Sequence, residues 1–283
     1  MSEGPIKGWA DVDIVASCVV GTVLLSMLVG VELRRHEPLL NLRLLGDRLF
    51  SLSNGVMFLA SIGFIGTLYL LALFYQDGLG LSALQSGLST FPEALGVMVG
   101  ARFIANRLYP VLGPRRIMCG GLVVAAGATC ALLLIGPATS LWWARLILFV
   151  MGFGMSGIFI PTQTAAFATI SPKNMGGAST LFNTERQLGG AVGVAVLTTV
   201  LAIVGPFSHV AGHVSANLSA YRFSFLAAAG FMAMGAVLSL FVHDEDAIAT
   251  ITRWRRKDQP AALDGRTAMH VAEGPRSTSI GHR

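Results

Sequence analysis

Seven long stretches of apolar sequence constrain what this chain can fold into. Each provides a window of about 20 residues, the length that a helix needs to cross the hydrocarbon core of a bilayer. None shows the strict alternation of a transmembrane β-strand. The stretches, which contain no Asp, Glu, Lys or Arg apart from Glu93, are Ile14–Val31, Leu49–Gln76, Gly78–Ala101, Ile117–Ala144, Leu146–Pro172, Gln187–Tyr221 and Phe223–Val242. The sequence therefore predicts an all-α polytopic membrane protein with seven transmembrane helices.

The composition excludes the common soluble classes. Hydrophobic residues make up 53% of the 283 residues and charged residues 12%, about half the charged share of an average soluble domain. A globule of this size has too little interior to bury so much apolar surface. Cys18, Cys119 and Cys130 lie inside apolar stretches, without the spacing of a metal site or a disulfide framework. We expect no metal, no cofactor and, because no Ser/His, paired-Asp or HExxH arrangement occurs, no enzyme activity.

The basic residues predict how the helices are oriented. Of the 20 Lys and Arg residues, all except Lys7, Arg145 and Arg222 fall on one side when the apolar stretches are taken as successive spans. Cytoplasmic segments carry such an excess, so we expect the N-terminus outside and the C-terminus in the cytoplasm. This topology explains the net charge of +5, and no nucleic-acid partner is expected.

Four segments resemble motifs of one family of carriers. In order, they are Leu39–Leu45 with Arg48-Leu49-Phe50, Leu81–Leu88 with Pro92, Gly152–Gly157, and Arg186–Ala195. Their order and spacing resemble the second helical bundle of the fourteen-span drug/proton antiporters of the major facilitator superfamily, the EmrB/QacA type. The resemblance covers about Trp9–Val242.

This resemblance implies a domain division and a function. Residues 1–48 would hold an extra transmembrane helix and a cytoplasmic linker, and 49–243 the six-helix C-terminal bundle. Residues 244–283, which are polar and lack periodicity, would form a cytoplasmic and largely disordered tail. The implied function is a part in proton-coupled multidrug efflux across the cytoplasmic (inner) membrane. The implied partners are membrane lipid, protons and lipophilic, cationic small molecules.

The resemblance also implies that the N-terminal bundle of the family lies outside this chain. Alternating access needs two bundles around a midplane site, so we expect the chain alone to be inactive as an exporter. A separate N-terminal half or self-association would complete it, and a truncated reading frame is a further alternative. The rival interpretation is a non-transporting membrane interaction protein or a vestigial fragment.

Glu93 is the strongest single candidate for substrate or proton binding. It lies near the middle of the third apolar stretch, next to Pro92. A charged side chain at the bilayer centre costs roughly 2.5–3.5 kcal/mol on insertion scales. We therefore expect Glu93 to face a cavity, a partner or a proton. The alternative is a neutral acid packed within the bundle.

Four further residues are candidates for the same site. Gln163 and Gln187 are polar residues on spans that, by resemblance, line the central cavity. Tyr75 and Phe159 are on such spans as well, and aromatic faces accept lipophilic cations. The alternatives are hydrogen bonds between neighbouring helices for the glutamines and core or lipid packing for the aromatic residues.

Three arginines are candidates for gating. The loop that holds Arg107 and Arg115 resembles a degenerate second-bundle copy of the family's gating loop, with Asn106 where an acid is expected. Arg186 follows Glu185 at the expected cytoplasmic mouth of the sixth span, where it would contact that loop. A solvated helix end is the alternative for this pair.

Overall fold

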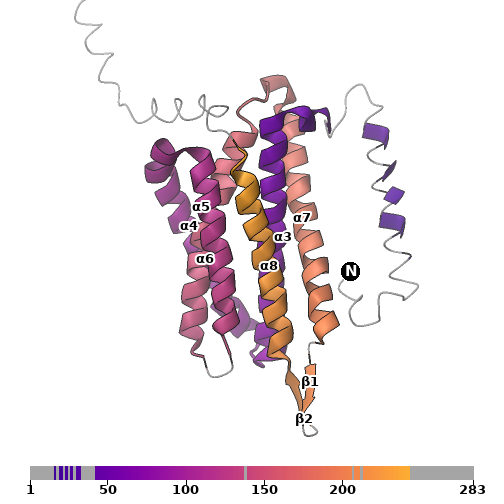
Figure 1. The fold of residues 1–283 in the computed structure, drawn as a ribbon, viewed down its shortest axis with the longest axis vertical. Coiled ribbons are helices and arrows are strands. Elements are labelled where there is room, and N and C mark those ends of the chain that lie inside the picture. Colours follow the sequence, from indigo (N-terminus) through magenta and orange to yellow (C-terminus); the bar gives the residue numbers. More distant parts are fainter. Residues whose placement is uncertain are drawn as a thin grey trace, which may run out of the picture.

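A computed structural model describes residues 16, 19–21, 23, 24, 26, 27, 30–32, 42–136, 139–205, 207–210 and 213–242. Ten of the 18 residues of the expected first span, Ile14–Val31, are described and all ten are helical, whereas the expected tail, 244–283, lies entirely outside the described residues. The six-helix part of the prediction lies within the described range 42–242 (Figure 1).

Six long helices follow one another along the chain. They are α3 (Arg48–Leu73), α4 (Ala83–Phe103), α5 (Tyr109–Ala131), α6 (Leu141–Ala166), α7 (Met175–Val204) and α8 (Leu218–Ser239). Among the described residues, five helical segments are long and apolar enough to cross a membrane: Arg48–Gly78, Val111–Leu134, Leu141–Ala166, Pro172–Val204 and Leu218–Ser239. Helix α4 runs beside them with 21 residues and is less apolar because it contains Glu93 and Arg102. The chain is an all-α polytopic membrane protein.

Polar caps set the beginnings of several helices. Asp47 accepts a hydrogen bond from the backbone N–H of Phe50 at 2.9 Å at the start of α3. Ser82 and Gln85 form a capping box at the start of α4, and Asn217 caps α8. These side chains bond backbone donors that the first helical turn leaves free.

Short elements connect the long helices. Five single turns are Leu42–Gly46 (η1), Phe74–Gly78 (η2), Ile104–Leu108 (η3), Leu132–Leu134 (η4) and Pro172–Asn174 (η5), of which η2 and η3 are π-helical. Gly113, with φ of 75°, breaks the helical path inside α5 just before Pro114. Between α7 and α8, β1 (Phe207–Val210) and β2 (His213–Ala216) form an antiparallel hairpin. The sequence did not predict this hairpin, which is a loop feature outside the helices.

The helices form two layers. Helix α6 packs against α4, α5 and α3, whereas α3 packs against α7, α8 and α6. Figure 1 shows α5 and α8 in front of α6 and α3, with α4 on one side and α7 on the other. The rear layer therefore runs in the order α4, α6, α3, α7. One of its faces is covered by α5 and α8, and no helix of the described range 42–242 covers the other.

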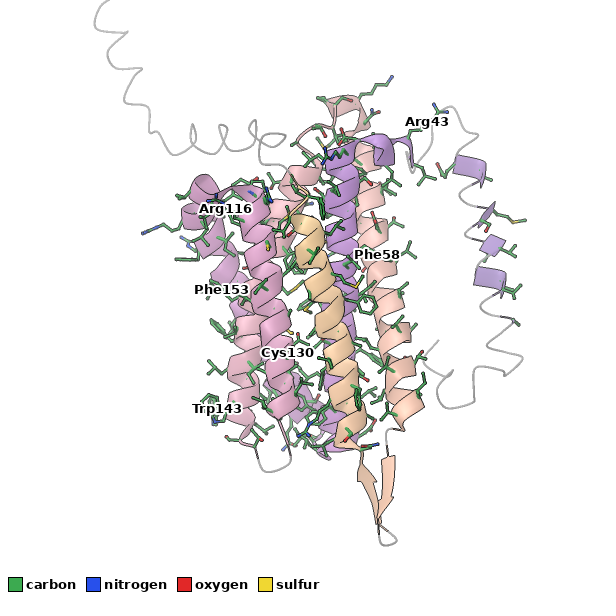
Figure 2. The ribbon with its side chains drawn as sticks, viewed as in Figure 1. Arg43, Phe58, Arg116, Cys130, Trp143 and Phe153 are labelled. Atoms are coloured by element: carbon green, nitrogen blue, oxygen red, sulfur yellow. The ribbon has the colours of Figure 1, made fainter. Side chains whose placement is uncertain are left out.

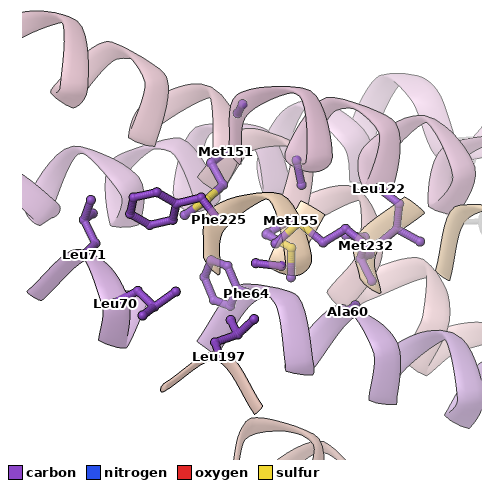
Figure 3. Packing of buried hydrophobic residues seen from close by; sticks show 14 of the residues in the cluster. Ala60, Phe64, Leu70, Leu71, Leu122, Met151, Met155, Leu197, Phe225 and Met232 are labelled. Carbon is purple, nitrogen blue, oxygen red and sulfur yellow. The ribbon is translucent and has the colours of Figure 1, made fainter. Parts of the chain in front are cut away.

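The core lies between the two layers. Figure 3 shows Phe64 of α3, Met151 and Met155 of α6, and Met232 of α8 packed together there. Thr129 of α5 is also buried at this level, and its hydroxyl donates to the Ala125 carbonyl at 2.9 Å. Packing between the layers buries one side of each helix, and many large apolar side chains, among them Leu84, Val123 and Met234, remain exposed on the outside of the bundle.

The two ends of the bundle differ in charge. Figure 2 shows Arg43 and Arg116 at one end and Trp143 at the other. The element order also brings Arg48, Arg102, Arg107, Arg115 and Lys173 to the first end, and Arg145 and Arg222 to the second. At the second end, the Arg145 guanidinium carbon lies 4.8 Å from the centroid of the Trp142 ring. We call these the Arg116 end and the Trp143 end.

Two helix boundaries differ from the prediction. Helix α6 begins at Leu141 rather than near Leu146, because Ser140 caps it. Helix α7 begins at Met175 and has 30 residues, so Glu185 and Arg186 lie inside a continuous helix and not at its mouth. Arg186 is about 16 Å along the axis from Met175, at 1.5 Å per residue.

Candidate functional site

Glycines bring the backbone of α4 directly against α6. A methyl group on Gly152 would collide with the Glu93 carbonyl oxygen, and one on Gly96 would collide with the Phe149 carbonyl oxygen. Small residues allow this kind of close approach between membrane helices. The contact fixes Glu93 at the seam between α4 and α6.

The same glycine-rich segment of α6 also meets α5. A methyl group on Gly154 would lie 2.8 Å from the Gly121 carbonyl oxygen. Gly152 and Gly154 therefore face different helices, and α6 is held between α4 and α5. These glycines have a packing role, which agrees with their place inside a membrane helix.

Glu93 is half-buried at mid-helix, in the α4 segment that contains Pro92. Within the described residues, its carboxylate has neither a hydrogen bond nor an ion pair. A carboxylate at this depth is costly unless it has a proton, a cation or a polar partner. Glu93 therefore has no polar partner among the described residues, and a bound proton would remove the cost of its charge.

Phe159 and Gln163 lie one helical turn apart on α6. The Phe159 ring meets the Phe64 ring of α3 edge-on, with 5.8 Å between centroids and 75° between planes. Gln163 is exposed. Phe159 follows Gly152 by two turns and so shares its stripe of α6. This stripe lies between α4 and α3 on the uncovered face of the rear layer, and it contacts Glu93 at Gly152, two turns from Phe159.

The hydroxyl group of Tyr75 is a polar group nearer the Trp143 end of the bundle. Its ring is fully buried at 0% exposure, and its hydroxyl has no hydrogen-bond partner in the described structure. Arg145 of α6 lies within electrostatic range of Tyr75, and the Nε atom of Arg145 is likewise buried without a partner. Arg145 precedes Gly152 by two turns, so it belongs to the same stripe of α6.

The structure separates Gln187 from the other candidates. Gly189 and Gly193 of α7 face α3, whereas Gln187 is exposed on another side of that helix. It borders an open hollow of about 400 Å³ that is lined by Asn183, Thr184, Gln187 and Leu188. The other four candidates are spread along the rear layer: Glu93 lies at the middle of α4, Phe159 and Gln163 toward the Arg116 end of α6, and Tyr75 is buried at the Trp143 end.

The three candidate gating arginines lie in different surroundings. Arg107 is exposed in the π-turn η3, and Arg115 is half-buried just after the break at Gly113. Both belong to the Arg116 end. Arg186 lies farther along the bundle axis on α7, which packs mainly against α3 and α8, and its Nε atom is buried without a partner.

Sequence reasoning missed a set of buried polar atoms along the seam between α3 and α7. Asn54 Oδ1, Ser61 Oγ and Glu185 Oε2 are all buried without a hydrogen-bond partner in the described structure. The available signal was the polar pair Ser53-Asn54 inside an otherwise apolar stretch. Glu185 could be included in this set of buried polar residues only once the structure showed that α7 continues through it.

The described residues hold no group of three or more His, Cys, Asp or Glu side chains that could bind a metal ion.

Comparison with protein families shows that the model of the Major Facilitator Superfamily matches residues 14–194, which is more than half of the chain.

Several curated proteins are similar to this chain over part of their length. The puromycin resistance protein of Streptomyces alboniger is 32% identical over 197 residues, which cover 69% of this chain and 39% of that protein. The lincomycin resistance protein of Listeria monocytogenes is 28% identical over 248 residues, with coverage of 83% and 51%. A multidrug resistance protein B homolog of Mycobacterium tuberculosis is 32% identical over 205 residues, with coverage of 71% and 38%. The chain spans about half of these relatives or less.

Proposed function

Because the chain belongs to the major facilitator superfamily, we propose that it provides the C-terminal six-helix bundle of a proton-coupled multidrug exporter of the fourteen-span type. Relatives named for puromycin, lincomycin and multidrug resistance support this assignment. In this proposal residues 1–48 form an extra helix and linker, 49–243 the bundle, and 244–283 a cytoplasmic tail. The substrates are lipophilic cations, exchanged for protons.

One observation carries the proposal: the uncovered face of the α4, α6, α3, α7 layer presents both a carboxylate and an aromatic ring. Glu93 has no polar partner among the described residues. Phe159 lies two turns along α6 from Gly152, the residue that contacts the Glu93 backbone, and one side of its ring is packed on Phe64. A carboxylate attracts a cation, and an aromatic ring adds a cation–π contact. Gln163 and Tyr75 supply further polar atoms along the same layer.

This face needs a second bundle to become a closed site. Alternating access depends on two bundles that move around a midplane site, and one layer supplies one wall. We propose that an N-terminal bundle, or a second copy of this chain, forms the opposite wall. Gln187, on a different side of α7, would then contact lipid or the partner rather than the substrate.

The charge difference between the two ends supports a topology. Arg43, Arg48, Arg102, Arg107 and Arg115 gather at one end, and an excess of Lys and Arg is typical of cytoplasmic loops. We place this end in the cytoplasm, the N-terminus outside, and the protein in the cytoplasmic (inner) membrane. Arg107, Arg115 and Arg186 would then control access from the cytoplasmic side.

Dye efflux from proteoliposomes tests the proposal. The chain is reconstituted alone and together with the N-terminal bundle of the Listeria relative, and ethidium efflux is followed under an imposed pH gradient. We expect efflux only with both bundles present. Efflux from the chain alone would show that no separate N-terminal bundle is needed, and the opposite wall would then have to come from a second copy of the chain. Absence of efflux from a co-purified pair would refute the exporter and favour a membrane interaction protein.

A further inference from the structure

Helices α3 and α7 pack side by side and run in the same direction. A methyl group on Gly189 would lie 2.8 Å from the Phe58 carbonyl oxygen, and four residues farther on Gly193 meets Ile62 in the same way. The two helices thus keep a constant register. Glu185 lies one turn before Gly189 on α7, and Asn54 lies one turn before Phe58 on α3. The register therefore brings Glu185 and Asn54 to the same level of the seam.

Both side chains present an oxygen atom that lacks a donor. Asn54 is 1% exposed, and its Nδ2 donates to the Phe50 carbonyl of its own helix at 2.8 Å. This bond uses one of the two N–H donors of the amide, and it leaves Oδ1 buried without a partner. Glu185 Oε2 is also buried without a partner. Two acceptors therefore share one buried seam, and neither can satisfy the other.

We propose that Glu185 and Asn54 form a proton-binding site. Glu185 Oε2 takes up one proton from water, and the resulting O–H group donates to Asn54 Oδ1. A single proton thus gives both buried oxygens a hydrogen-bond partner, and its release to water reverses both changes. Leaving such atoms unpaired is costly in a low-dielectric interior, which is why proton uptake is favourable here.

The surrounding charges do not provide another partner. Arg186 is adjacent to Glu185 on α7, and adjacent helical residues do not face each other. Helix α3 has no Asp, Glu, Lys, Arg or His between Arg48 and Asp77. The other charged groups on the elements packed against α3 and α7 are Arg43, Asp47, Glu93, Arg102, Arg145, Lys173 and Arg222. All except Glu93 lie near one end of the bundle or the other, and Glu93 lies on α4, which packs mainly against α6. Ser61 Oγ, next to Gly189, is a further unpaired oxygen along the seam.

A proton-coupled exporter needs a group that binds and releases a proton, and the Glu185–Asn54 site would be that group. This role in coupling rests on the proposed function. Proton binding itself can be measured without transport. The two proposals therefore fail separately in experiment.

Infrared difference spectroscopy of the full chain in lipid membranes tests the site. Spectra are recorded between alkaline and acidic buffer, and the C=O stretch of a protonated carboxyl group is followed. We expect one such band to disappear in Glu185→Gln and to shift in Asn54→Leu, which removes the acceptor. Asp77→Asn, at an exposed carboxyl on the Trp143 end, serves as the matched control and should retain the band.

The outcomes separate the alternatives. An unchanged band in Glu185→Gln would overturn the site, and so would a spectrum that responds to sodium but not to pH. Glu185→Gln keeps the size of the side chain and offers an amide donor to Asn54, so we expect it to fold, as circular dichroism would verify. A band assigned to Glu185 without any dye efflux from the paired bundles would refute the exporter and leave the proton site standing.

Discussion

The ring of Phe159 on α6 meets the ring of Phe64 on α3 edge-on, with 5.8 Å between the two centroids. Phe64 is 9% exposed and belongs to the core, whereas Phe159 is half-buried at the rim of the candidate site. The pair therefore joins the packed interior to the uncovered face. It also connects the two central helices of the rear layer, two turns along α6 from Gly152, which contacts the Glu93 backbone.

This contact predicts a measurable coupling between the two rings. Phe64→Ala should lower the free energy of unfolding by about 3 kcal/mol, because it empties a buried position. Phe159→Ala should cost less, since part of that ring is exposed. The double mutant should be less destabilised than the sum of the two by roughly 0.5–1.5 kcal/mol, the range for aromatic pairs. Reversible unfolding in mixed micelles gives all three values, and strictly additive effects would contradict the coupling.

The close approach of α4 and α6 predicts a contrast between two glycines. Gly152→Ala should disrupt the bundle, because the added methyl group collides with the backbone carbonyl of Glu93, which cannot move without moving α4. Gly230→Ala in α8 places its methyl group in open space and should be neutral or stabilising by up to about 1 kcal/mol. Thermal stability and elution from a sizing column compare the two variants. Equal tolerance would show that α4 does not pack on α6 in this way.

The orientation predicts which cysteine positions react from which side. In a variant without native cysteines, Gly46→Cys and Leu112→Cys should react with a membrane-impermeant maleimide only from the cytoplasm. Ser140→Cys, at the Trp143 end, should react from outside. Labelling in intact cells and in inverted vesicles provides the measurement. Reaction of Gly46→Cys in intact cells would reverse the proposed topology.

The order of the helices could be predicted from the sequence because long apolar stretches are a strong signal in a membrane protein. Their ends were harder to predict. Charged residues were taken as boundaries, but Arg145, Glu185 and Arg186 lie inside helices, and each has a polar atom that is buried without a hydrogen-bond partner in the described structure. The beginning of α6 depends instead on the Ser140 cap. Charge alone therefore misplaces the beginning of α6 by about one turn and that of α7 by about three turns.

The candidate site was predicted only in part. Glu93 stood out because a lone carboxyl inside an apolar stretch is rare. Gln187 was grouped with it by polarity, yet it lies on a different side of α7, which depends on how the helix is rotated against α3. Asn54 and Glu185 are far apart in sequence, and their shared level follows from the glycine contacts between α3 and α7. Helix rotation and register are tertiary properties that a single sequence does not reveal.

The last prediction concerns the carboxyl group of Glu93. Glu93→Gln keeps the shape of the side chain and removes its charge, so it should weaken binding of a cation in the transport cycle. With a second bundle supplied, we expect the initial rate of ethidium efflux to fall roughly tenfold, which corresponds to about 1.4 kcal/mol. Efflux of an uncharged drug should change little. Asp77→Asn, which removes an exposed carboxyl at the Trp143 end, should leave both rates unchanged. The rates are compared at equal protein content in the membrane. If Glu93→Gln exports every cationic dye at the normal rate, the carboxyl has a packing role and the substrate must bind elsewhere on the uncovered face.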